Sequence, residues 1–227
     1  MTIPMQSPPQ TLGELRQRAE RLAGKTIGDI ASQIGFDVPQ NLKRKKGWQG
    51  QMIEAALGTD SGNLSQPDFS LLGVELKTLP INLQGQVEES TYVSVLNLSD
   101  HHLLQWHDCS VYHKLSHVLW VPVAKIPGQA VTQSRIATPF FWKPNQQQAA
   151  LLKSDWEAVM DLVSLGQFDQ INARMGEILQ VRPKAAHSRV TTDAIGSNGE
   201  SIKTLPRGFY LRPGFTQQLL NQALKCD

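Results

Sequence analysis

Cysteine is scarce in this sequence, and its scarcity argues against two kinds of scaffold. Cys109 and Cys226 are the only cysteines among 227 residues, and neither belongs to a CxxC pair. The sequence therefore indicates neither a disulfide framework nor a cysteine-rich zinc site, and we expect two free thiols.

Long apolar runs are also lacking. No stretch approaches the run of about 20 apolar residues that is needed to span a bilayer. The first ten residues, MTIPMQSPPQ, contain no basic region followed by an apolar one, so they do not read as a secretory signal. We therefore expect the chain to stay in the cytoplasm.

A marked excess of charge of either sign is absent too. The net charge is +2, and 19% of the residues are charged while 40% are hydrophobic, which is typical of an ordinary globular protein. Such a small net charge does not identify a nucleic-acid binder, although basic residues can still gather locally. The length is enough to bury a sizeable core, as one large domain or two closely packed lobes.

Helical patterns are present at both ends and in the middle of the chain. Thr11 and Glu14 are spaced as a capping box before the first helix, a second helix starts near Thr26, and Gly58 ends a third. We also expect helical structure over 146–179, broken near Gly166, and a final helix from 214 to 225. The apolar residues of that last helix either pack on its own domain or form a partner surface.

Strand patterns fill the rest of the sequence. The stretches TYVSVLNL, HVLWVPVA and RIATPFFW predict strands over 91–98, 117–124 and 135–142, and we expect the helices of 146–179 to cover this sheet. The stretch from 181 to 214 reads as strands and turns. The class is therefore α/β.

The segment PDFSLLGVELKT, residues 67–78, sets Asp68, Glu75 and Lys77 among apolar residues. The strand period of two puts Glu75 and Lys77 on one face, and Gly73 permits a turn that brings the two carboxylates together. Two adjacent carboxylates repel unless a cation lies between them, and Mg²⁺ accepts such oxygen ligands. Lys77 can hold an attacking water or stabilise charge on a phosphate, so this set suits phosphodiester hydrolysis.

A structural alternative for this segment stays open at this point. Glu75 and Lys77 can be a solvated strand face, with Asp68 as a turn residue after Pro67. Against it stands Glu54, a third acid in an apolar neighbourhood, on a helix that directly precedes the motif.

Basic residues of the last third offer a second candidate surface. Arg182, Lys184 and Arg207 can neutralise phosphates or donate to base edges, and Gly208 would let the backbone approach a groove closely. A cationic solvated surface explains the same residues equally well.

Four stretches together resemble one known family over essentially the whole chain. KGWQGQMIEAALG, PDFSLLGVELKTLP, VRPKA and GFYLRP are similar to the MutH family of DNA mismatch-repair endonucleases. Within them, Pro67-Asp68 and Glu75-Leu76-Lys77 resemble the PD-(D/E)xK signature of restriction enzymes. The resemblance implies a restriction-endonuclease-like fold, with a mixed central sheet flanked by helices, as a single endonuclease domain over residues 1–227 with two lobes around a DNA-binding cleft.

The resemblance also implies an activity, a cofactor and partners. It implies Mg²⁺-dependent nicking of the unmethylated strand at hemimethylated GATC sites in double-stranded DNA, with a MutL-type ATPase as activator and a MutS-type sensor recognising the mismatch. The site residues that it implies are Asp68 and Glu75 as metal ligands, Lys77 for the water, Glu54 and Lys114 as accessory groups, and Arg182, Pro183, Lys184 and Tyr210 as DNA-reading residues. Arg207 and Gly208, in the same basic segment, complete the candidate DNA-binding set.

Two other functions remain as alternatives. The chain can be a catalytically silent module that binds DNA or recruits a partner, or a restriction enzyme that cuts both strands at GATC. The sequence contains no GxxxxGK[ST] run, so any ATP dependence must come from a partner.

Overall fold

The structure is a computed structural model, and it describes residues 6–39, 47–60, 66–98, 105–184 and 190–225. The chain divides into two compact units, each made of two segments. Unit 1 comprises Met1–Glu88 and Ser116–Lys143, and unit 2 comprises Glu89–Leu115 and Pro144–Asp227.

Three short helices open unit 1, as the sequence predicted: α1 (Leu12–Glu20), α2 (Ile27–Gln33) and α3 (Trp48–Leu57). The capping box expected at α1 is only half formed, because Thr11 accepts from the Glu14 amide while the Glu14 carboxylate accepts from the Gln10 amide. A complete capping box stands at the start of α2 instead, between Thr26 and Asp29. Gly58 ends α3 in the left-handed conformation, with φ 78°.

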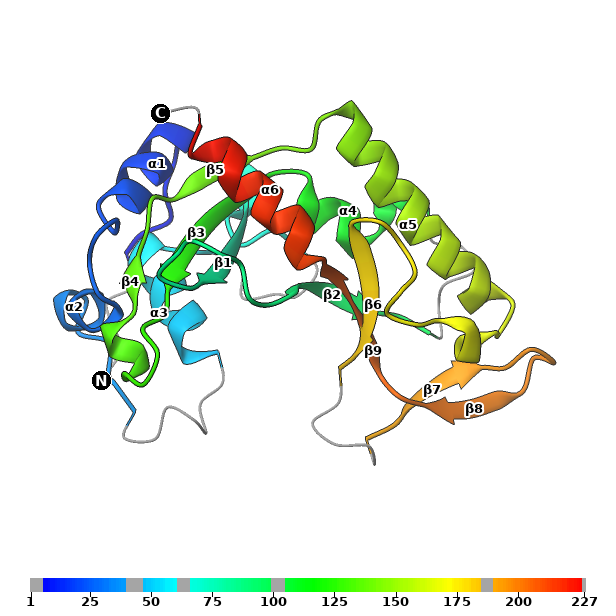
Figure 1. The fold of residues 1–227 in the computed structure, drawn as a ribbon. Helices are drawn as coiled ribbons and strands as arrows, with labels where there is room; N and C mark the ends of the chain where they lie inside the picture. Colours follow the sequence, from blue (N-terminus) through cyan, green and yellow to red (C-terminus); the bar gives the residue numbers. More distant parts are fainter. Residues whose placement is uncertain (1–5, 40–46, 61–65, 99–104, 185–189, 226–227) are drawn as a thin grey trace. The chain divides into compact units, whose positions relative to one another are not determined.

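A four-stranded mixed sheet forms the centre of unit 1 (Figure 1). β1 (Glu75–Ile81) runs parallel to β3 (Val118–Ala124), and β4 (Arg135–Ile136) and β5 (Phe140–Trp142) pair antiparallel with β3. The single strand predicted over 135–142 is thus two short strands. Side chains of the three helices share a buried cluster with Leu76, Leu119 and Val121 of this sheet, which is the mixed sheet with packed helices that we expected.

Unit 2 contains two antiparallel sheets. In the first, β9 (Arg207–Leu211) lies between β2 (Thr91–Leu96) and β6 (Leu179–Pro183). β7 (Thr192–Ile195) and β8 (Ser201–Thr204) form a separate hairpin. The expectation that 91–98 and 117–124 share one sheet is wrong, because β2 pairs with β9 whereas β3 pairs with β1.

The helices of unit 2 are α4 (Ser110–Leu115), α5 (Gln146–Ser164) and α6 (Pro213–Ala223). Helical structure expected up to residue 179 ends much earlier, at Ser164, and within unit 2 α5 packs against β6. In α6, Phe215, Leu219 and Leu220 are buried, while Leu224 beyond its end is exposed. The apolar stripe of α6 is thus largely occupied by packing.

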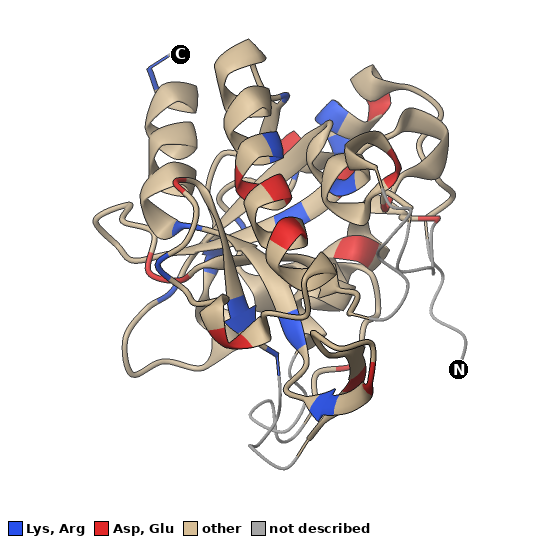
Figure 2. Cartoon of the chain, turned by 90° about the vertical axis from the view of Figure 1, so that its right-hand side faces the viewer, with Lys and Arg blue, Asp and Glu red and all other residues tan. Residues whose placement is uncertain are grey.

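Basic and acidic residues are interspersed along the described chain, in keeping with its small net charge (Figure 2). No helix in the described ranges is both long enough and apolar enough to cross a bilayer. The fold class is therefore the mixed α/β architecture, with several sheets and six α-helices in the described residues.

Candidate active site and nucleic-acid interface

A tight turn connects Asp68 with the start of β1. Phe69 and Val74 exchange two backbone hydrogen bonds around a 3₁₀ turn, and Gly73 closes that turn with φ 61°. Because φ is positive there, glycine is the residue that fits without strain. The turn directs Asp68 back toward β1, where its Oδ2 atom accepts a 2.8 Å hydrogen bond from the Leu76 amide. The carboxylate of Asp68 is thereby fixed at the Glu75–Leu76 peptide.

Glu75 and Lys77 form a buried ion pair next to this turn. The Nζ atom of Lys77 donates to Oε1 of Glu75 over 3.0 Å, and the two residues are only 7% and 3% exposed. The Glu75 amide donates to the His117 carbonyl, which continues the pairing of β1 with β3. The alternative that these residues are a solvated strand face is therefore wrong.

The two accessory candidates lie on different units. Glu54 is half-buried on α3, and α3 packs against β1 within unit 1. Lys114 has a buried side chain at the end of α4, in unit 2. The grouping of Glu54 and Lys114 with the carboxylates of the motif stays a prediction.

The carboxylates of Asp68 and Glu75 suit a hard cation that takes its remaining ligands from water and from the substrate. Among the described residues, no group of three or more His, Cys, Asp and Glu side chains is placed to hold a metal ion. Mg²⁺ does not need such a cage, because it usually keeps several waters and takes one or two carboxylates plus substrate phosphates. Asp68 and Glu75 offer two carboxylates with several acceptor positions each, so they fit this requirement.

Most of the DNA-binding candidates lie on one three-stranded sheet of unit 2. Tyr210 on β9 stands directly opposite Tyr92 on β2, and their rings meet edge to face with centroids 5.3 Å apart. The Arg182 guanidinium lies 5.9 Å from the Tyr210 ring centroid, and the Lys184 ammonium lies 3.6 Å from that of Tyr92. We call Tyr92, Arg182, Lys184 and Tyr210 the aromatic–cation cluster. It brings together three residues of one sheet and Lys184, which directly follows β6.

Burial shifts the pKa values of three residues of this cluster. It raises the pKa of Tyr92 and of Tyr210, so both phenols remain protonated at neutral pH and can donate a hydrogen bond. Partial burial lowers the pKa of Lys184 from its ordinary value. Arg182 also donates to the Ser90 hydroxyl over 3.0 Å, which fixes the direction of its guanidinium.

The other candidates of this segment have visible structural functions. A Cβ on Gly208 would lie 3.0 Å from both the Ser94 carbonyl and the Tyr92 ring, so glycine makes room there for packing within the sheet. Gly208 is buried in the central strand, and its close approach to a DNA groove stays a prediction. Arg207 donates to Thr204 and to the carbonyls of Leu205 and Phe168, and it thereby holds the β8–β9 connection.

Pro183, paired with Arg207, is exposed at the end of β6.

Sequence reasoning missed Tyr92 and Asp155. The alternation in TYVSVLNL predicted the strand, but only the register of β2 on β9 brings Tyr92 opposite Tyr210. Asp155, buried on α5, accepts hydrogen bonds from the amides of Glu177, Ile178 and Leu179 and so anchors the start of β6. The one sequence signal for Asp155 was that a single acidic residue stands in the apolar stripe of a helix.

Comparison with known proteins supplies the family. The family model described as "DNA mismatch repair enzyme MutH" matches residues 57–155. A DNA mismatch repair protein MutH of Haemophilus influenzae is 49% identical over 217 residues, which cover 96% of this chain and 97% of that protein. The chain belongs to the MutH family.

Two further MutH proteins match over a similar extent. Those of Shewanella woodyi and Vibrio campbellii are each 48% identical, over 215 and 216 residues, and each match covers 95% of this chain. The stretch matched by the MutH family model contains Asp68, Glu75, Lys77 and Lys114. The aromatic–cation residues Arg182, Lys184 and Tyr210 lie C-terminal to that stretch.

Proposed function

We propose that this member of the MutH family is a Mg²⁺-dependent DNA endonuclease that nicks the unmethylated strand at hemimethylated GATC sites during methyl-directed mismatch repair. The observation that carries the proposal is the packing of Asp68, Glu75 and Lys77 at the start of β1. The Asp68 carboxylate is bound to the amide that follows Glu75, and Lys77 is bound to Glu75 itself.

The proposed mechanism assigns a separate task to each residue of this group. Asp68 and Glu75 hold Mg²⁺, with Glu54 and Lys114 as accessory groups. When bound, Mg²⁺ stabilises negative charge on the phosphate and lowers the pKa of a bound water. Lys77 positions the attacking water, and its charge opposes the charge that develops on the phosphate oxygens.

We propose that the aromatic–cation cluster reads the DNA. Arg182 and Lys184 neutralise phosphates or donate to bases, and Tyr210 contacts the adenine N6 edge, where methylation removes a donor hydrogen and adds bulk. Pro183, Arg207 and Gly208 support this surface through the pairing of β6 with β9. We also propose that the chain acts in the cytoplasm, where such an enzyme would meet its DNA.

The partners that we propose follow from the same function. A MutL-type ATPase activates the enzyme, and a MutS-type sensor acts indirectly by recognising the mismatch. Both proposals derive from the MutH family resemblance.

A plasmid assay tests the function and separates it from its two alternatives. Supercoiled plasmid with hemimethylated GATC sites is incubated with the protein, a MutL-type ATPase and ATP, in Mg²⁺ or in EDTA. We expect nicked circles in Mg²⁺ and none in EDTA. Linear fragments would instead identify an enzyme that cuts both strands, and intact supercoiled DNA in both conditions would identify a catalytically silent module.

A further inference from the structure

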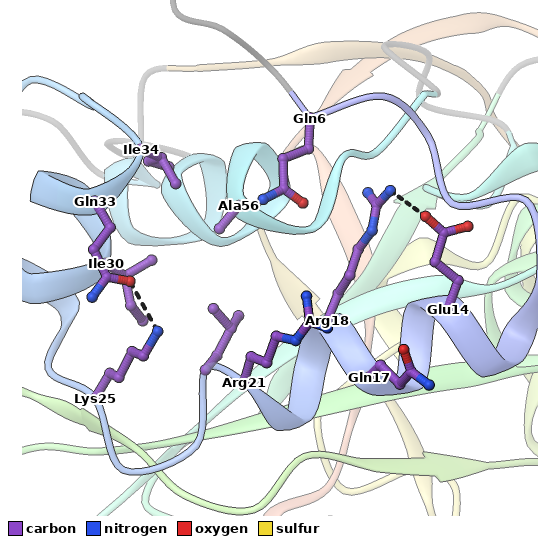
Figure 3. A pocket seen from close by; sticks show the side chains of 11 residues that line it. Gln6, Glu14, Gln17, Arg18, Arg21, Lys25, Ile30, Gln33, Ile34 and Ala56 are labelled. Carbon is purple, nitrogen blue, oxygen red and sulfur yellow. Dashed lines mark hydrogen bonds and ion pairs between the residues drawn. The ribbon is translucent and has the colours of Figure 1, made fainter.

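The pocket among the three helices of unit 1, about 520 Å³ in volume, is lined by polar side chains that are already paired with one another (Figure 3). Arg18 is bound to Glu14, and Lys25 donates to Gln33. Ile30, which also lines the pocket, is only 1% exposed, so it offers an occupant almost no apolar surface. Neither the charges nor the apolar side chains of this pocket therefore mark a site for a ligand.

In unit 2, by contrast, two hydrogen bonds connect β6 with the residue just before β2. Both bonds meet at the hydroxyl of Ser90. The side-chain amide of Gln180 donates to Ser90 Oγ over 2.8 Å, and the guanidinium of Arg182 donates to the same atom over 3.0 Å. Gln180 and Arg182 are two residues apart on one strand, so their side chains leave the same face of β6. One hydroxyl therefore binds two neighbouring polar side chains of that face.

The two side chains bound to Ser90 differ in exposure. Gln180 is buried, with 6% of its surface exposed, and it lies opposite Tyr210 in the pairing of β6 with β9. Arg182 is exposed. Ser90 thus connects a side chain that the sheet holds in place with one that is open to solvent.

The Arg182 guanidinium is held at two points and is otherwise open. Ser90 binds its terminal nitrogen Nη1, and its carbon lies 5.9 Å from the centroid of the Tyr210 ring. Its Nη2 and Nε atoms donate to no acceptor within the described part of the chain. Because a guanidinium carries five N–H groups in a planar fork, most of them stay available to a ligand in a fixed direction.

A fixed direction matters more for reading a base than for attracting a phosphate. Arginine recognises guanine through two N–H groups that must lie in the plane of the base edge. Attraction to the DNA backbone depends mainly on charge and is independent of sequence. An arginine that is already oriented also loses less side-chain freedom when it binds. The contact with Ser90 should therefore favour specific binding over non-specific binding.

We propose that Ser90 is a positioning residue for sequence-specific DNA recognition. Its hydroxyl, held by Gln180, orients the guanidinium of Arg182 toward a base edge of the GATC site. This inference rests on the proposed function, because it takes DNA as the ligand and Arg182 as one of the residues that read it. It adds Ser90 and Gln180 to the residues on which the selectivity for GATC depends.

The test separates recognition of the site from general binding of DNA. The first measurement is KM and kcat for nicking of a hemimethylated GATC duplex, in the presence of a MutL-type ATPase and ATP. The second is Kd for the same duplex with a scrambled site, from fluorescence anisotropy. We expect Ser90→Ala to raise KM about two- to tenfold, which corresponds to the cost of immobilising one side chain. Its kcat and its Kd for the scrambled duplex should match those of the wild type.

Two variants control for the loss of a hydroxyl. Ser90→Thr keeps a hydroxyl on the same carbon, so its KM should stay close to that of the wild type. Ser94→Ala is the matched control, because the buried Ser94 hydroxyl has no hydrogen-bond partner among the described residues. We expect its KM to be unchanged.

A double-mutant cycle tests whether Gln180 acts through Ser90. Gln180→Leu should raise KM in the same direction, since Ser90 loses the partner that holds it. The double variant Ser90→Ala/Gln180→Leu should then have the KM of Ser90→Ala alone, because two residues that act through one contact are not additive. Should Gln180→Leu unfold, the comparison of Ser90→Ala with Ser90→Thr decides.

Two results would overturn the positioning role of Ser90. In one, Ser90→Ala nicks with the KM of the wild type. In the other, its KM and its Kd for the scrambled duplex rise by the same factor, which would indicate a general loss of DNA binding. Arg182→Ala locates the error. If Arg182→Ala raises KM and Ser90→Ala does not, only the positioning is wrong, whereas a wild-type KM in both variants would mean that Arg182 does not read the site.

Discussion

Because the Glu75–Lys77 pair is buried, substitution of either residue should affect the stability of the fold as well as the activity. On a solvated strand face Lys77 would contribute little to stability, but the Glu75–Lys77 pair is buried and its charged atoms are 3.0 Å apart. Removing one partner of such a pair leaves an uncompensated buried charge, which typically costs about 3–5 kcal/mol. A chemical role for Lys77 therefore has to be separated from a structural one.

For this residue we expect Lys77→Ala to lower both the nicking rate and the free energy of unfolding. The double variant Glu75→Gln/Lys77→Met removes both charges and should recover most of the stability, because no unpaired charge stays buried. Urea unfolding and single-turnover nicking measure the two effects. If the double variant regained nicking together with stability, neither residue would act in the chemistry.

Asp68→Asn provides a test with almost unchanged shape. The amide oxygen of asparagine can still accept from the Leu76 amide, so the turn should persist while the negative charge is lost. We expect nicking to be abolished and binding to a GATC duplex to be retained or tightened, since a charge that repels phosphates is gone. Nicking close to the wild-type rate would remove Asp68 from the metal site.

Tyr210→Phe tests the sensing of methylation. A tyrosine hydroxyl is ordinarily protonated at neutral pH, and burial raises the pKa of Tyr210 further, so it can donate as well as accept. One good base contact is worth roughly 1–3 kcal/mol, so we expect selectivity against fully methylated GATC to fall about ten- to a hundredfold. Nicking of duplexes that differ only in their methyl groups measures this ratio. Tyr112→Phe is the matched control, because Tyr112 lies outside the aromatic–cation cluster and keeps its ring contact with Trp106 when the hydroxyl is removed.

At the scale of elements, local signals were read well and distant pairings were not. The capping residue Thr26, the glycine after α3 and the period-two pattern of β1 each act within a few residues, and the structure contains all three. The end of α5 was misjudged because the apolar residues after Gly166 pack in a turn and at the start of β6 rather than on a helix. The backbone amides of residues 177–179 donate to Asp155, which lies 22–24 positions earlier in the chain. No local sequence pattern predicts such a long-range hydrogen bond.

Gly58→Ala tests how α3 is connected to the start of the chain. A Cβ there would lie 2.8 Å from the carbonyl oxygens of Gln6 and Ser7, and the backbone has φ +78°. The left-handed conformation alone costs about 1–2 kcal/mol for alanine, and the close contacts should add about 1–3 kcal/mol. Gly24→Ala is the control, because Gly24 has φ +79° with nothing within 4 Å of a Cβ. Urea unfolding should show the larger loss for Gly58→Ala, and equal losses would mean that the contact relaxes.

At the scale of the molecule, the two units contain different parts of the proposed activity. Asp68, Glu75 and Lys77 belong to unit 1, whereas the aromatic–cation cluster belongs to unit 2. The chain passes from one unit to the other three times, after Glu88, Leu115 and Lys143. Sequence patterns alone did not reveal this division, because each unit is assembled from segments that are far apart in the chain. The motif residues of unit 1 were nevertheless identified, since Asp68 and Glu75 are only one turn apart.

This division predicts the outcome of mixing two inactive proteins. Asp68→Asn should bind DNA without cutting it, and Arg182→Ala/Lys184→Ala should keep the carboxylates but bind weakly, with a reduced salt dependence of binding. If one chain must supply both its carboxylates and its cations to the same GATC site, an equimolar mixture should nick plasmid no faster than the Arg182→Ala/Lys184→Ala protein alone. Each protein is first checked by urea unfolding, so that a loss of fold is not read as a loss of function. Nicking restored well above either component would instead mean that two copies share one site, with the carboxylates of one acting on DNA held by the cations of the other.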